Sequence, residues 1–125
     1  MQQQAHLQQV SQDRFELYRG DLIGLPVDRF HHVYRFNEPG CKVLFSVTRK
    51  GGSVSIHFAS DKHGLRVVKQ AVNEFCEMCF SMYDWCEMVL AVIEKPSVMR
   101  LADKCGFTLI GHLEDENSKI YMRQR

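Results

Sequence analysis

The sequence lacks any apolar run long enough to cross a membrane, and it shows no signal-peptide pattern. We therefore expect a cytoplasmic protein with no membrane partner. An excess of charge of either sign is also missing, since 16 basic residues stand against 15 acidic ones and the net charge is +1. Such a balance gives no electrostatic footprint for nucleic acid, so we expect no nucleic-acid partner.

The sequence also lacks the even set of cysteines that a disulfide framework requires. The five cysteines are Cys41, Cys76, Cys79, Cys86 and Cys105. An odd number embedded in apolar segments is typical of reduced, buried thiols. Cys76 and Cys79 have the spacing of half a zinc site, but zinc takes about four ligands. The same spacing is one step along an apolar helix face, so we expect packing and no metal.

What is present is organised around a stretch that runs from Ser53 to Phe107. Ser53–Ser60 (SVSIHFAS) alternates with a period of two, which predicts a half-buried strand. A helix is predicted from near Leu65, because apolar residues then recur at steps of three and four. Met88–Ile93 (MVLAVI) predicts a strand covered on both faces. A short helix from Pro96 to the stop at Gly106 follows. Strand, helix and covered strand form a βαβ unit with parallel strands.

The rest of the chain divides into an arm and one domain. Residues 1–13 are rich in glutamine and predict an N-terminal arm, whereas residues 14–125 form a single domain. Arg14–Arg19 is either a first strand with Phe15 and Leu17 inward or the end of a helix. Further strands are predicted at His31–Phe36, Lys42–Arg49, Phe107–Leu113 and Lys119–Arg123. The fold class is therefore α+β.

The last part of this pattern resembles the GNAT superfamily of N-acetyltransferases. Glu94–Phe107 (EKPSVMRLADKCGF), followed by a later glycine, is similar to the segment after the fifth strand of that family. The matching positions are Ser97, Lys104, Gly106, Phe107 and Gly111. The resemblance covers roughly residues 42–123. It implies a GNAT-like mixed, mostly antiparallel sheet with a central parallel βαβ unit and flanking helices.

The resemblance also implies acetyl-CoA as the acyl donor, held at the loop after the central strand. There, backbone N–H groups and the positive end of a helix attract a pyrophosphate. The cofactor-binding positions are then Lys62, His63, Gly64, Leu65, Arg66 and Ser97. The alignment puts Asp61 where the family has glutamine or arginine, and Arg66 where it has a small residue. Asp61 repels a pyrophosphate, and the nearby basic residues offset that charge. The alternative is a glycine with basic neighbours at an ordinary turn.

The catalytic residues are marked less clearly. In many members of the family a tyrosine protonates the leaving thiolate, and the corresponding position here is Ala102. His57 is the candidate base, because it is the titratable group on the central strand and its ordinary pKa is about 6.5. The alternative is a structural histidine on the less apolar face of that strand. Tyr121, on the closing hairpin, is the candidate replacement for the acid.

Two functions follow from these expectations. The first is an N-acetyltransferase that moves an acetyl group from acetyl-CoA directly to an amine on a small molecule or a protein, in a groove built by residues 20–36. The second is a catalytically degenerate GNAT-like protein that binds and modulates a protein partner. The altered loop and missing tyrosine favour the second, whereas the crevice at the carboxyl ends of the two parallel strands favours the first. We expect a cofactor-binding protein with slow acetyltransferase activity. The compact, divergent form of the chain suggests a phage-encoded protein, for example an inhibitor of a host protein in the host cytoplasm. Either function is compatible with a homodimer.

Overall fold

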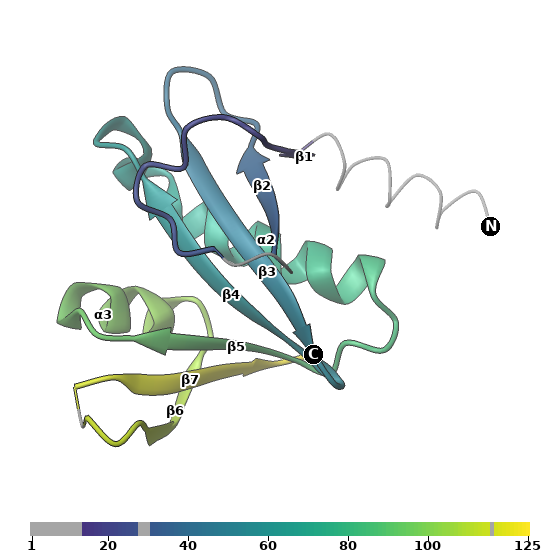
Figure 1. Cartoon of the computed structure of the whole chain (residues 1–125), viewed down its shortest axis with the longest axis vertical. Coiled ribbons are helices and arrows are strands. Elements are labelled where there is room, and N and C mark those ends of the chain that lie inside the picture. Colours follow the sequence, from purple (N-terminus) through teal and green to yellow (C-terminus); the bar gives the residue numbers. More distant parts are fainter. Residues whose placement is uncertain (1–13, 28–30, 116) are drawn as a thin grey trace.

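The computed structural model describes residues 14–27, 31–115 and 117–125 of the chain. The predicted glutamine-rich arm, residues 1–13, lies outside the described residues. Within them a seven-stranded sheet has the order β1-β2-β3-β4-β5-β7-β6 (Figure 1). The strands are β1 (Phe15–Leu17), β2 (His32–Phe36), β3 (Val43–Lys50), β4 (Ser53–Ser60), β5 (Met88–Ile93), β6 (Thr108–His112) and β7 (Lys119–Gln124). Neighbouring strands are antiparallel except β4 and β5, which are parallel.

The helical segments are the 3-10 turn η1 (His63–Arg66), α2 (Val68–Met82) and α3 (Pro96–Lys104). The predicted fold class is therefore confirmed: a mixed, mostly antiparallel sheet contains a central parallel βαβ unit with flanking helices. Both central strands have the predicted bounds. These two segments form strands because alternating or β-branched apolar residues pack well on a pleated surface. No helix in the described part of the chain is long and apolar enough to span a membrane.

The core lies between the sheet and α2. The Phe75 ring of α2 stacks on Phe45 of β3 with centroids 4.4 Å apart, and it also contacts the rings of Phe15 and Tyr34. The helix buries one stripe, made of Val68, Ala71, Val72, Phe75, Cys76, Met78 and Cys79. All five cysteines are free and buried, and no group of three or more metal-ligating side chains occurs among the described residues. The predicted buried thiols are confirmed.

The start of the long helix differs from the prediction. Helix α2 begins at Val68, whereas Leu65 belongs to η1 and is 61% exposed. The backbone of Val67, with φ of −114° and ψ of 1°, separates the turn from the helix. The two segments therefore have different axes, and the apolar stripe does not extend back to Leu65. At α3 the prediction is confirmed, since Pro96 opens the helix and Gly106 follows it with φ of +80°.

Two predictions about burial were wrong. Residues 15–17 form a strand, as one of the two alternatives had it, but Leu17 is 65% exposed while Phe15 is buried. The reason is a gap of about 310 Å³ between β1 and the last turns of α2, which Leu17 borders with Met78. Strand β5 is not fully covered on both faces, because Met88 and Leu90 on one face are half-buried and Val92 on that face is 39% exposed.

Candidate active site

The sheet opens between its two parallel strands. Strands β4 and β5 pair only from Ser53 to Ser55, opposite Met88 to Leu90. Beyond that point they diverge, as Figure 1 shows to the left of the marked C-terminus. Strand β4 stays paired with β3 over its whole length. The backbone groups of Ile56–Ser60 that face β5 therefore have no partner in the sheet ladder.

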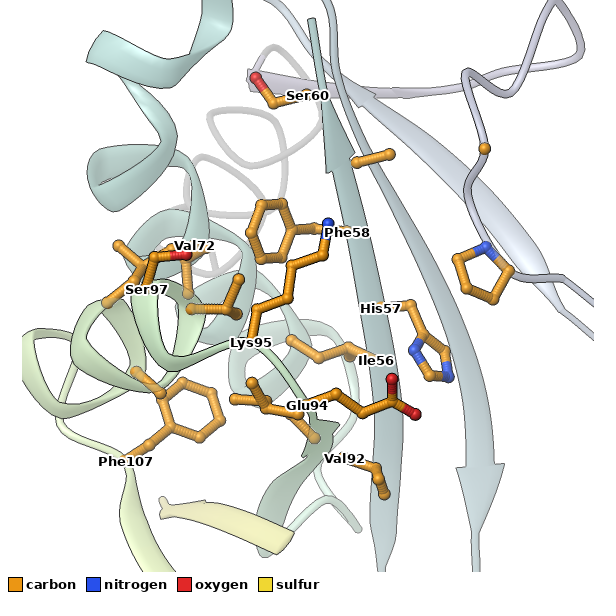
Figure 2. Close-up of a pocket in the computed structure, with 18 of the residues that line it drawn as sticks. Ile56, His57, Phe58, Ser60, Val72, Val92, Glu94, Lys95, Ser97 and Phe107 are labelled. Atoms are coloured by element: carbon orange, nitrogen blue, oxygen red, sulfur yellow. The ribbon is translucent and has the colours of Figure 1, made fainter. Parts of the chain in front are cut away.

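This opening is a slot of about 700 Å³ that passes from one face of the sheet to the other. We call it the β4–β5 slot. On the helical face its walls include Val72 of α2 and Ser97 of α3, and on the other face they include His57 (Figure 2). Pro26 also lies on the face of His57, because its carbonyl accepts a hydrogen bond from Ser46, the partner of His57 in β3. The lining residues are Ile23, Gly24, Pro26, Ile56, His57, Phe58, Ala59, Ser60, Leu65, Val72, Ala91, Val92, Ile93, Glu94, Lys95, Ser97, Val98, Leu101, Ala102 and Phe107.

His57 lies in the slot, as a candidate base must. Its Cα pairs with that of Ser46, and the adjacent Phe45 stacks on Phe75 of α2, so the His57 ring is on the face of β4 opposite α2. The ring is half-buried, and its centroid is 6.1 Å from that of His31. Burial lowers the pKa of His57 below its ordinary value of 6.5, and the nearby charge of His31 lowers it further. The imidazole is therefore neutral at pH 7 and is able to accept a proton.

Glu94 is a site residue that the sequence reasoning did not single out. It follows the last residue of β5 and lines the slot, and in Figure 2 its carboxylate points toward β4 on the side that carries His57. The buried Ser118 hydroxyl lies 3.0 Å from Asp115 Oδ2 and 3.3 Å from Glu94 Oε1, so its one proton is shared between these two carboxylates. The signal was available, because side chains directly after parallel strands meet at the edge where α/β sheets bind ligands. The next residue, Lys95, also lines the slot.

The predicted pyrophosphate loop is only partly at the slot. Lys62, His63 and Arg66 are exposed and are not among the lining residues, whereas Leu65 is. The Gly64 amide donates to Asp61 Oδ1 over 2.8 Å. The group expected to receive a phosphate therefore already has an anionic partner, and it belongs to η1 rather than to the first turn of α2.

The remaining predicted residues divide between the slot and the core. Ser97, at the start of α3, is exposed and lines the slot. Ala102 also lines it, so the position of the missing acid faces the slot with only a methyl group. Tyr121 is 5% exposed within the core and is not a lining residue. The structure therefore brings His57, Ser97 and Leu65 to one slot but does not bring Tyr121 to it.

Comparison with known proteins identifies the fold. No protein-family model matches the chain, and no curated protein matches it in sequence. Solved structures do match. A Bacillus subtilis acetyltransferase in complex with CoA aligns with a TM-score of 0.70 and 12% identity over 90% of this chain and 98% of the other. The fold is the GNAT fold.

Two further solved structures have the same fold. AAC(6')-Ib in complex with ribostamycin and coenzyme A aligns with a TM-score of 0.63 and 15% identity, over 77% of this chain and 65% of the other. The Campylobacter jejuni N-acetyltransferase PseH has a TM-score of 0.63 and 14% identity, over 78% and 70% of the two chains. At these identities the likeness to acetyltransferases establishes the GNAT fold alone.

Proposed function

We propose that this protein is an N-acetyltransferase that transfers an acetyl group from acetyl-CoA to a primary amine. The observation that carries the proposal is the β4–β5 slot, which crosses the sheet and holds His57 and Glu94 on one face. Solved structures with this fold are acetyltransferases in complex with CoA, and with an aminoglycoside in one case, which supports the same class of donor and acceptor.

The slot suits the thioester arm of the donor. Its walls are mainly apolar, with Ile56, Phe58 and Val98 among them, and its volume of about 700 Å³ is within the usual range for ligand pockets. The β5-facing backbone groups of β4 lack ladder partners, so they are able to bond to the amides of an extended ligand. When bound, acetyl-CoA supplies an acetyl group activated as a thioester.

His57 and Glu94 act on the acceptor. An amine arrives mostly as an ammonium ion, and the Glu94 carboxylate attracts it to the side of the slot that carries His57. The neutral His57 ring then accepts the proton that the amine must lose before it attacks the acetyl carbon. No tyrosine is among the residues that line the slot, and the position of the family's acid, Ala102, presents only a methyl group. Without a tyrosine to protonate the leaving thiolate, we expect slow turnover, because general acid–base help is typically worth about 10²–10⁴-fold.

The test combines calorimetric titration with acetyl-CoA and an assay for released thiol in the presence of small primary amines. Acetyl-CoA should bind, and His57→Ala should lower the rate at pH 8 by at least about tenfold without weakening acetyl-CoA binding. Glu94→Gln should raise the KM for the amine and leave acetyl-CoA binding unchanged. His112→Ala, an exposed position on edge strand β6, is the matched control and should change neither quantity.

The partner-binding function remains the second candidate, and the edge strand β6 favours it. Leu109 and Ile110 on this strand are 51% and 52% exposed. Exposed apolar side chains on a free strand edge are a feature of protein-binding surfaces. Absence of acetyl-CoA binding in the titration, together with no thiol release, would support this candidate over the enzyme.

A further inference from the structure

The turn after β4 already contains an anion of its own. The Asp61 carboxylate accepts the backbone N–H of Gly64 at 2.8 Å and also a hydrogen bond from the backbone of Lys42. The bond from Lys42 is the largest cause that lowers the pKa of Asp61, and the charges of His63 and Lys42 lower it further. The carboxylate is therefore ionised at neutral pH. It occupies the position at which an amide of this turn would otherwise meet a phosphate oxygen.

The turn is also closely packed at Gly64. Gly64 is buried, and a Cβ atom built on it would collide with Ser60 Oγ and lie 2.7 Å from Val43 Cγ2. The glycine is therefore needed for close packing of η1 against β3 and β4. The β4–β5 slot reaches Ser60 and Leu65 at this end and does not include Gly64. The slot therefore ends before it reaches the Gly64 amide.

We propose that the protein recognises its donor by the acyl-pantetheine arm and not by the nucleotide diphosphate, because Asp61 takes the place of the pyrophosphate at the Gly64 amide. This inference rests on the proposed function and names the part of the donor that the site selects. A pyrophosphate near the Gly64 amide meets an ionised carboxylate, and like charges repel, whereas the cations of Lys62 and Arg66 are exposed to water and offset that repulsion only in part. The apolar slot and the open backbone of β4 are unaffected by that repulsion.

The first experiment compares two donors with the unmodified protein by calorimetry. S-acetylpantetheine carries the thioester arm without phosphate or nucleotide, and acetyl-CoA carries both. The dissociation constants are expected to agree within about tenfold, because most of the recognition lies in the shared arm. A dissociation constant for acetyl-CoA lower by more than about tenfold would overturn the inference.

The second experiment opens the turn. Asp61→Ala removes the carboxylate and frees the Gly64 amide, so acetyl-CoA should bind about tenfold more tightly, and S-acetylpantetheine should bind as before. Asp61→Asn keeps an acceptor for Gly64 but removes the charge, and it should show part of the gain. This second variant also decides the matter if Asp61→Ala fails to fold. Asp84→Ala, at an exposed position after α2, is the matched control and should bind both donors like the parent protein.

The outcomes separate the two proposals. Weak binding of S-acetylpantetheine beside tight binding of acetyl-CoA, or no gain in either Asp61 variant, would overturn the inference and leave the acetyltransferase function in place. Failure of both donors to bind the unmodified protein would remove the proposed function, and the inference with it.

Discussion

At the scale of single residues, the environment of His57 predicts a specific pH dependence. Burial lowers its pKa below 6.5, and the charge of His31 contributes to the shift. If His57 is the base, the rate should rise with pH through this lowered pKa and level off near neutral pH. Replacing the neighbour, in His31→Gln, should move the rising limb of the rate toward higher pH. A pH–rate profile of kcat/KM for both proteins measures this, and an unmoved limb would separate His31 from the titration of His57.

The same lowered pKa affects stability. The unfolded chain binds a proton at His57 more readily than the folded protein does. The stabilisation from a neutral His57 is therefore fully present above the ordinary value of 6.5 and decreases as the pH falls below it. Activity and stability thus decline together on the acid side. Unfolding midpoints measured beside the rates keep the two effects apart.

Gly64 also allows a prediction at this scale. A methyl group at Gly64 would collide with Ser60 Oγ and Val43 Cγ2, and the buried Val43 cannot move freely. Gly64→Ala should therefore lower the free energy of unfolding by about 1–3 kcal/mol, the usual cost of overpacking. Gly52→Ala is the matched control, since the nearest atom to its Cβ is Trp85 O at 3.9 Å. Urea unfolding measures both variants, and equal stability of the two would contradict the packing role of Gly64.

At the scale of elements, helix α2 depends on its small buried thiols. Cys79 has no exposed surface, and burial raises the pKa of its thiol far above the ordinary value. Cys79→Ala should cost on the order of 1 kcal/mol through a small cavity. Cys79→Ser should cost more, about 1–3 kcal/mol, if its hydroxyl finds no partner in the core. Thermal unfolding with and without a chelator measures this, and a chelator-dependent midpoint would contradict a purely structural thiol.

The elements themselves could be predicted because their signals are local. Alternation along Ser53–Ser60 and the branched run of Met88–Ile93 fix a strand wherever they pack, and Pro96 with Gly106 marks both ends of a helix. The exposure of a side chain depends instead on which other elements pack against it, and a local sequence pattern does not contain that information. Leu65 matched a helical spacing, yet the backbone at Val67 turned it away from the stripe. Leu17 shares a strand face with Phe15, yet helix α2 leaves a gap beside it.

The candidate site was less accessible to sequence reasoning for the same reason. His57 could be named because it is titratable and lies on the central strand. The hydrogen bond between Asp61 and Gly64 could not be predicted, because the sequence shows only an acidic residue three positions before a glycine. Whether that carboxylate turns toward the Gly64 amide depends on the backbone of the whole turn. Glu94 and Tyr121 show the same limit, since residue type alone did not tell which of them faces the slot.

At the scale of the whole molecule, one ion pair ties the edge of the sheet to the helical layer. Arg14, beside β1, donates to both oxygens of Glu74 in α2, over 2.8 and 3.0 Å. The hydrogen bond from Arg14 is the main cause that lowers the pKa of Glu74 below 4.5. The stabilisation is therefore present above pH 4.5 and is lost as the pH falls through the lowered value.

Glu74→Gln should remove this part of the acid sensitivity. The variant should be less stable than the parent protein at neutral pH, and the difference should shrink as the acid protonates Glu74 in the parent. Urea unfolding at several pH values below 7 measures the gap. Asp103→Asn, an exposed acidic position on α3, serves as the control and should keep the full acid sensitivity. A gap that stays constant with pH would show that the pair does not contribute through charge.

The short pairing of β4 with β5 divides the sheet into two halves that separate along most of their length. One half consists of β1 to β4 and the other of β5, β7 and β6. The ladder pairing that joins them is at Ser53–Ser55. A ligand that lies between the two halves supplies the hydrogen bonds that the strands do not make with each other. Ligand binding therefore extends the backbone hydrogen bonding of the sheet. Amide hydrogen exchange at Ile56–Ser60 should slow when a donor binds, even though these residues already belong to a strand in the free protein.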